Sequence, residues 1–70
     1  MMFKIGDLLE LRDDGIKVFV YNKNTCDWEQ VLRGTPAMYL GRTRIDWVLL
    51  MINGEQRESM PEDWLIMGEK

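Results

Sequence analysis

The sequence predicts a small all-β domain, either a barrel or a sandwich. Short apolar or alternating segments recur at intervals of roughly 8 to 12 residues, with turn-forming residues between them. No long segment carries apolar residues with the period of an amphipathic helix. At 70 residues the chain is near the lower limit at which one hydrophobic core maintains a fold. We therefore expect residues 1–70 to form a single domain.

The N-terminal half predicts two strands and a third segment whose type is open. Leu8–Arg12 alternates leucines with charged residues, as a strand with one buried face does. The turn sequence Asp13–Gly15 separates it from Ile16–Tyr21, which alternates again. Asp27–Arg33 has an apolar spacing that fits a helical turn as well as an irregular strand. We expect a hairpin over Ile16–Leu32.

The middle of the chain predicts two more strands and a tight turn. Gly34–Pro36 interrupts the pattern, and Ala37–Arg42 then has the character of a strand in which Gly41 indicates a bulge or bend. Trp47–Ile52 is wholly apolar, half of it β-branched or aromatic, and too short for a helix, so we interpret it as a strand. Asn53-Gly54 tolerates the two positive φ angles of a type I′ turn and is a strong hairpin signal.

The C-terminal segment predicts a return strand, a short turn and a last strand. Glu55–Met60 returns from the hairpin, and Pro61 ends it because proline donates no hydrogen bond to a sheet. Glu62-Asp63 suits a single tight turn of 3-10 type. Trp64–Met67 then resumes an apolar run and provides the last strand.

The Asn53-Gly54 turn also fixes a register for the strands that it joins. With these two residues in the loop, Ile52 lies opposite Glu55, and counting outward places Leu50 opposite Arg57. Both faces of the first strand are then apolar, whereas the return strand is mostly polar on both faces. A strand that is apolar on both sides requires a cover on each side.

We predict that the face carrying Trp47 lines the core, because Met60 belongs to that face. The opposite face is then covered by the Ile16–Leu32 excursion, by a second subunit or by a ligand, with self-coverage and a homo-oligomer equally weighted. The residues of this candidate oligomer face are Val48, Leu50 and Ile52.

Composition argues against several functional classes. The net charge of −3, without a basic stripe, argues against nucleic-acid binding. The absence of histidine and the single cysteine remove the common zinc sites and the usual general base. One cysteine forms no intramolecular disulfide, so we expect a reducing compartment, the cytoplasm. Met1–Lys4 has no signal-peptide pattern, and no apolar run is long enough for a membrane span. We expect no cofactor and no metal.

Four groups of residues carry weaker chemical signals. Cys26 has acidic neighbours and no histidine to activate it, so we expect it to be structural or incidental. Glu62-Asp63 and Asp13-Asp14 are acidic pairs of a kind that binds metal or serves hydrolysis, but in turns they are usually solvated. Arg42 and Arg44, near Tyr39 and Trp47, suit either single-stranded nucleic acid or a surface ion pair with Asp46.

The order of several short motifs resembles the small barrels of the Src-homology-3-like type, a group that includes Tudor and KOW domains. The resemblance rests on Lys4–Leu9, on Asp46–Leu49, and on Asn53-Gly54 followed by Met60–Leu65, and it covers about half of the chain. It implies a barrel of about five strands, of phage or bacterial type, with a 3-10 turn before the last strand. Ile16–Gly34 has no aligned counterpart and occupies the long first loop of such a barrel, as a loop or a hairpin insertion.

The resemblance also implies a binding groove. In peptide-binding members an aromatic groove accepts an extended polyproline II ligand, which loses little entropy on docking. Carried over by position, the groove residues are Trp47, Pro61 and Trp64, with Tyr21 or Tyr39 as neighbours. The alternative is that Trp47 and Trp64 are packing residues of the core or its rim, since large aromatic side chains dominate small cores.

The sequence therefore predicts a noncatalytic protein-interaction module, either an adaptor or a self-associating accessory subunit, in the cytoplasm of a bacterium or an infected host cell. One alternative is a nucleic-acid-associated barrel of the KOW or Tudor sort. The other is a small regulatory subunit or inhibitor of an enzyme. The expected partner is a protein or a second copy of the chain.

Overall fold

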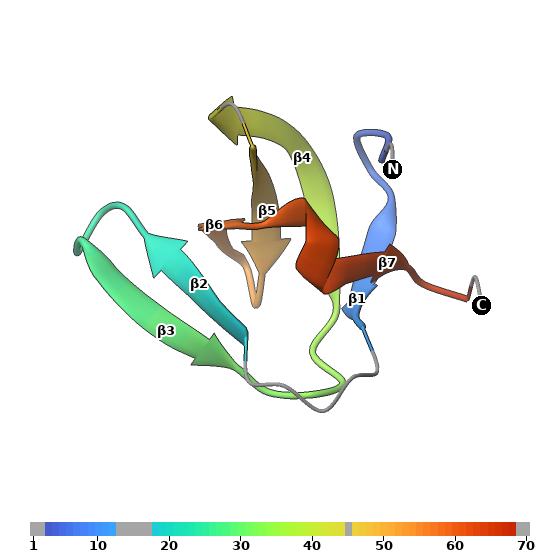
Figure 1. Ribbon diagram of the computed structural model, residues 1–70, viewed down its shortest axis with the longest axis horizontal. Coiled ribbons are helices and arrows are strands. Elements are labelled where there is room, and N and C mark those ends of the chain that lie inside the picture. Colours follow the sequence, from blue (N-terminus) through green and yellow to red (C-terminus); the bar gives the residue numbers. More distant parts are fainter. Residues whose placement is uncertain (1–2, 13–17, 45, 69–70) are drawn as a thin grey trace.

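The computed structural model describes residues 3–12, 18–44 and 46–68. Within them the chain forms seven β-strands and one short 3-10 helix, whose arrangement is shown in Figure 1. The elements are β1 (Leu8–Leu11), β2 (Val18–Asn22), β3 (Asp27–Val31), β4 (Ala37–Arg44), β5 (Trp47–Ile52), β6 (Glu55–Ser59), η1 (Pro61–Asp63) and β7 (Trp64–Ile66).

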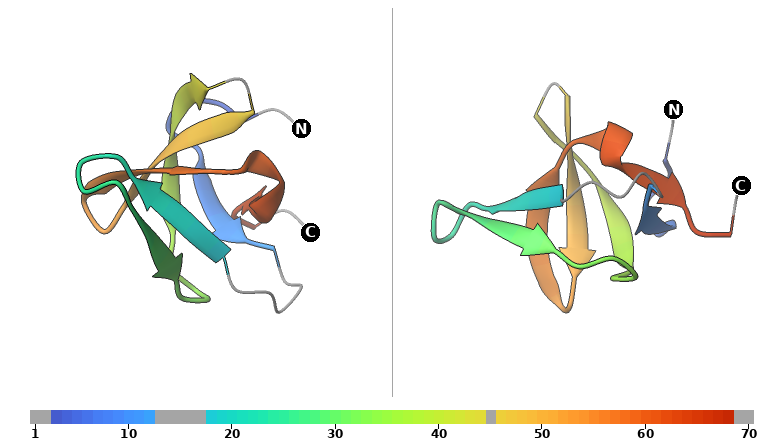
Figure 2. Two further views of the ribbon diagram at one scale, coloured as in Figure 1. Left: turned by 60° about the vertical axis from the view of Figure 1, so that its left-hand side comes forward. Right: turned by 60° about the horizontal axis from the view of Figure 1, so that its bottom comes forward.

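The strands form one antiparallel sheet in the order β3-β2-β6-β5-β4-β1-β7. Figures 1 and 2 show the sheet curling, with β2 and β3 projecting at one side and both chain ends at the other. β3 and β7 form the two edges, so the described strands do not close into a barrel. The all-β prediction is confirmed. The sheet has seven strands rather than about five, because β2 and β3 add two strands beside β6.

The strand segments expected from the sequence are present in the described residues. Trp47–Ile52 has the expected bounds, and the ambiguous Asp27–Arg33 segment contains the strand β3 rather than a helical turn. The expected bulge is found at Gly41, where the pairing with β5 shifts register and the φ angle is 133°. The expected turn Asp13–Gly15 and the start of Ile16–Tyr21 lie outside the described residues.

The β5–β6 hairpin has the predicted register. Ile52 pairs with Glu55 and Leu50 pairs with Arg57. Asn53 and Gly54 have φ angles of 53° and 79°, the two positive values that a type I′ turn requires. The local turn chemistry therefore sets the pairing of both strands.

The prediction of which β5 face lines the core was wrong. The buried residues of β5 are Val48, Leu50 and Ile52, and Leu50 has no exposed surface. These side chains pack with Leu9, Val20 and Trp64 in the hydrophobic core. The three residues expected to form an oligomer face are therefore inside the domain. Met60 misled the prediction because it lies beyond the end of β6 and takes no part in the ladder.

The outer face of the sheet carries a row of exposed apolar side chains. Leu8 on β1 pairs with Met38 on β4, and both are exposed because their chain neighbours point into the core. Met67, whose backbone N–H donates to the Leu8 carbonyl oxygen (2.8 Å), continues the row beside β7. Within residues 3–12, 18–44 and 46–68, no helix has the length and apolar character needed to cross a lipid bilayer.

Candidate functional site

A pocket of about 370 Å³ lies where the N-terminal segment, β4, β5 and η1 meet. Its lining is aromatic and apolar, with one arginine and one aspartate. The lining residues are Phe3, Tyr39, Arg42, Asp46, Trp47, Val48 and Pro61. Tyr39 and Trp47 lie on the neighbouring strands β4 and β5, whereas Phe3 and Pro61 come from distant parts of the sequence, so the pocket is a product of the tertiary fold.

Backbone hydrogen bonds hold the N-terminal wall of the pocket against β4. The Gly6 N–H donates to the Tyr39 carbonyl oxygen, and the Tyr39 N–H donates to the Asp7 carbonyl oxygen, each at 2.9 Å. The Asp7 side chain closes the turn by accepting from the Lys4 N–H at 2.8 Å. Phe3 thereby packs on Tyr39 with ring centroids 5.5 Å apart in an edge-to-face arrangement.

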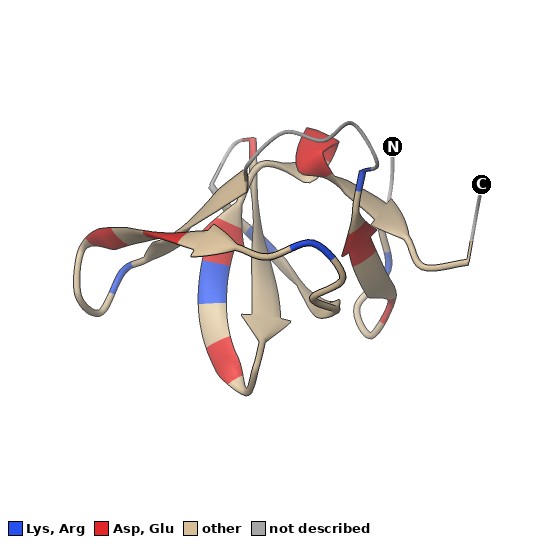
Figure 3. Ribbon diagram, turned by 90° about the horizontal axis from the view of Figure 1, so that it is seen from below, with Lys and Arg blue, Asp and Glu red and all other residues tan. Residues whose placement is uncertain are grey.

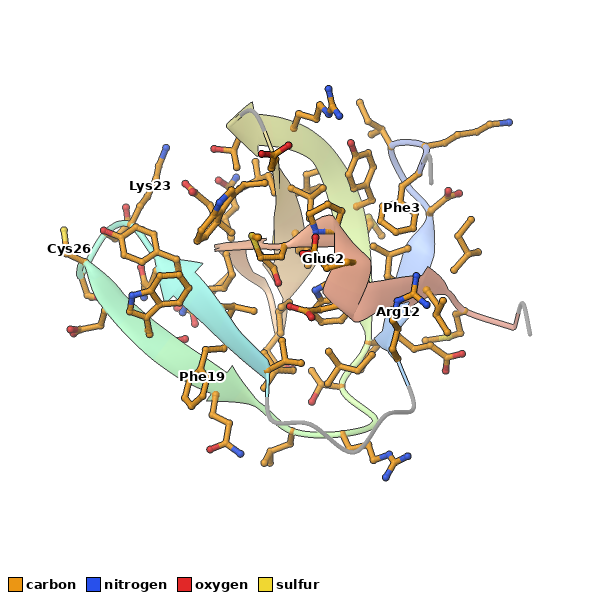
Figure 4. The ribbon with its side chains drawn as sticks, in the orientation of Figure 1. Phe3, Arg12, Phe19, Lys23, Cys26 and Glu62 are labelled. Atoms are coloured by element: carbon orange, nitrogen blue, oxygen red, sulfur yellow. The ribbon has the colours of Figure 1, made fainter. Side chains whose placement is uncertain are left out.

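Pro61 is fixed by the 3-10 helix that it begins. Proline suits this position because its φ angle is preset and no amide hydrogen bond is lost. The N–H of Arg12 donates to the Asp63 carbonyl oxygen at 3.1 Å, and the Arg12 Nε donates to the Glu62 carbonyl oxygen. Figure 4 shows Arg12 beside η1 and Phe3 nearer the N-terminal end of β1.

Trp47 also connects the pocket to the β2–β3 hairpin. Its ring packs on Trp28 of β3 with centroids 5.4 Å apart, and Trp28 packs on Tyr21 of β2 at 5.2 Å. Trp28 nevertheless remains 54% exposed. The aromatic surface therefore continues from the pocket along the hairpin.

Three of the five residues expected to form a groove line this pocket. They are Tyr39, Trp47 and Pro61. Tyr21 lies outside it and reaches Trp47 through Trp28. Trp64 was wrongly placed in the groove, since it has no exposed surface and its Nε1 donates to Ser59 Oγ at 2.9 Å in the core.

Sequence reasoning missed two elements of the site. Phe3 was not considered, although an aromatic residue just before the Gly6-Asp7 turn was an available signal. Arg42 was considered only for nucleic acid or a surface ion pair, and it lines the pocket with Asp46. Figure 4 places Cys26 at the tip of the β2–β3 hairpin, where it is exposed and away from η1.

The pocket combines three aromatic rings and a proline with two side chains of opposite charge. Such a surface has the apolar area and the single donor and acceptor groups that ligand sites commonly combine. Glu62 and Asp63 form part of η1, and no cluster of three or more potential metal ligands occurs in the described parts of the chain.

Comparison with known proteins gave no match: no family model fits the chain, and no curated protein or solved structure is significantly similar to it.

Apart from the pocket, a group of polar side chains surrounds Arg57, a buried residue of β6. Its Nε donates to Glu29 Oε1 at 2.8 Å and its Nη2 donates to Glu55 Oε1 at 2.9 Å. Glu29 also accepts from Asn22 Nδ2 at 3.3 Å. The hydrogen bonds from Arg57 and then Asn22 lower the pKa of Glu29, and the bond to Glu29 raises the pKa of Arg57.

Acid should destabilise the fold through Glu29. A carboxylate whose pKa is lowered by folding stabilises the native state above its unfolded pKa, and this contribution is lost as the pH falls through the lowered value. We expect the urea midpoint of the unmodified chain to fall more between about pH 5 and about pH 3 than that of Glu29→Gln. Identical pH profiles for the two proteins would contradict the assignment.

Proposed function

We propose that the chain is a noncatalytic protein-interaction module that binds an extended, proline-containing segment of a partner protein. The binding site is the pocket between Phe3, Tyr39, Trp47 and Pro61. The observation that carries the proposal is the convergence of these residues on one open cavity, although they come from separate segments. The partly buried Phe3 ring packs on Tyr39 and forms one wall of the pocket.

The chemistry of the pocket favours this class of ligand. A polyproline II segment has no internal hydrogen bonds and is already extended, so it loses little entropy when its rings pack on aromatic faces. Trp47 and Tyr39 supply such faces beside Pro61. Arg42 and Asp46 are placed to orient the ligand by its charged or polar flanking groups.

We further propose a Src-homology-3-like type for this module. In this proposal the five strands of the barrel type are β1, β4, β5, β6 and β7, and η1 precedes the last of them. The β2–β3 hairpin then occupies the long first loop. We propose that this module is an adaptor of phage or bacterial type whose only activity is binding.

Replacement of Trp47 by alanine tests the proposal. The probe is a proline-rich peptide of about ten residues, roughly 31 Å long when extended, titrated by isothermal calorimetry. We expect Trp47→Ala to weaken binding by roughly 30-fold, the effect of removing a central aromatic anchor. The variant should stay folded, because Trp47 is only partly buried.

The matched control is Phe19→Ala, which removes an aromatic ring that is 49% exposed on β2 and does not line the pocket. It should bind the peptide as tightly as the unmodified chain. Equal affinities for Trp47→Ala and the unmodified chain, or no binding by either, would refute peptide binding in this pocket.

A further inference from the structure

The β2–β3 hairpin is joined to the rest of the sheet by a short ladder, while Val20 and Val31 pack in the hydrophobic core. We call residues 18–31 the arm. Among the described residues, the ladder that joins the arm to β6 consists of one residue pair, Tyr21 with Glu58. Within the arm, by contrast, β2 and β3 pair along their whole lengths, from Val18 with Val31 to Asn22 with Asp27. Figure 1 shows the arm projecting from the body of the molecule.

The Glu29–Arg57 ion pair provides a second connection. In the sheet, β2 lies between β3 and β6, so no backbone hydrogen bond of the ladder joins β3 directly to β6. The ion pair connects these two strands across β2. Arg57 is only 7% exposed and is further held by the Gln56 carbonyl oxygen at 2.7 Å. Figure 3 shows the acidic positions of the arm beside β6, which carries a basic position.

The third connection reaches the pocket itself. Trp28 belongs to the same strand as Glu29, and adjacent residues of a strand point to opposite faces. Glu29 therefore binds Arg57 on the inner face while Trp28 packs on Trp47 on the outer face. Because the two residues are neighbours on one strand, we expect a shift of β3 that breaks the ion pair to move Trp28 relative to Trp47, which lines the pocket.

We infer that the Glu29–Arg57 ion pair is a latch that seats the arm and thereby positions Trp47 at the pocket. Glu29 is a positioning residue, because it touches neither the pocket nor a ligand in it. The predicted effect of the latch on affinity rests on the proposed peptide-binding function. The seating of the arm is a property of the free protein.

Glu55 provides a matched control for Glu29, because both carboxylates bind Arg57. It forms the same kind of bond to Arg57 as Glu29 does, at 2.9 Å against 2.8 Å. It lies on β6 together with Arg57, however, so its removal breaks no link to the arm. Glu29→Gln and Glu55→Gln remove the same charge from the same arginine, and only the first opens the latch.

The test measures the coupling between Trp28 and Trp47 and the affinity for the proline-rich peptide. Two indoles in contact give paired circular-dichroism bands of opposite sign, and Trp28→Phe identifies the bands of this pair by removing them. We expect Glu29→Gln to lose most of the signal and to bind the peptide roughly two- to tenfold more weakly, as loss of an aromatic contact implies. Glu55→Gln should retain both.

The inference is overturned if Glu29→Gln keeps the paired bands, if both variants lose them equally, or if the unmodified chain lacks them. Should Glu29→Gln fail to fold, Glu29→Asp keeps the charge, shortens the side chain and is expected to show the same loss. Absence of peptide binding by the unmodified chain would refute the proposed function, and the circular-dichroism comparison would still decide the latch.

Discussion

Trp64→Ala is expected to reduce the free energy of unfolding by about 3 to 5 kcal/mol, the cost of removing a large aromatic side chain from a core. Trp64 has no exposed surface and packs with Leu9 and Leu50 in the core cluster. The truncation also leaves the buried Ser59 hydroxyl without the indole N–H that it accepts. Small domains have a total stability of roughly 5 to 15 kcal/mol, so the variant should be largely unfolded or close to it.

Urea denaturation followed by circular dichroism measures this loss. Trp64→Phe should lose less unfolding free energy than Trp64→Ala, because it keeps an aromatic ring in the core. It should still be less stable than the unmodified chain, because it lacks the hydrogen bond to Ser59. Phe19→Ala, at an exposed position, should change stability by no more than about 0.5 kcal/mol. A Trp64→Ala protein as stable as the unmodified chain would place this residue on the surface and restore it as a groove residue.

Leu50→Ala is expected to cost about 2 to 5 kcal/mol, because Leu50 is fully buried and its removal creates a cavity. Leu49 precedes it in β5 and points to the opposite, partly exposed face. We therefore expect Leu49→Ala to cost less than half as much. The two variants carry the same substitution, leucine to alanine, on opposite faces of one strand, so their difference in stability reports which face is buried.

The same urea titration distinguishes the two faces. A larger loss for Leu49→Ala than for Leu50→Ala would mean that the Trp47 face lines the core. It would also return Val48, Leu50 and Ile52 to the surface as a candidate contact between copies of the chain. The buried positions of these three residues exclude that role in the present structure.

Local signals determine much of this fold. Asn53 and Gly54 admit the left-handed conformations of a type I′ turn, and the two-residue loop leaves one register for β5 and β6. Pro61 supplies no hydrogen-bond donor to a sheet and begins η1. Such effects depend on a few neighbouring residues and are therefore visible in the sequence.

The inward face of β5 depends on residues that are distant in the sequence. Both faces of this strand are apolar, so periodicity alone gives no preference. Arg57 and Ser59 lie opposite the inward-facing residues of β5, and both are buried although they are polar. Each has a hydrogen-bond partner from another strand: Arg57 donates to Glu29 of β3, and Ser59 accepts from Trp64 of β7. Neither partner follows from the pattern around β6.

The candidate site was partly predictable for a similar reason. Trp47 and Pro61 were found because a motif order places them beside a turn and a 3-10 helix. Phe3 was missed because its role depends on the hydrogen bonds that hold Gly6 and Asp7 against β4. Trp64 was misplaced because its burial is decided by the pairing of β7 with β1.

The most direct test of the peptide-binding pocket is a ¹H–¹⁵N correlation spectrum recorded during titration with the proline-rich peptide. We predict that the shifted amides cluster at Phe3, Tyr39, Arg42 and Asp46–Val48, and that the Trp47 indole N–H shifts with them. Shifts confined to the outer row of Leu8, Met38 and Met67, or no shifts at any peptide concentration, would contradict the account.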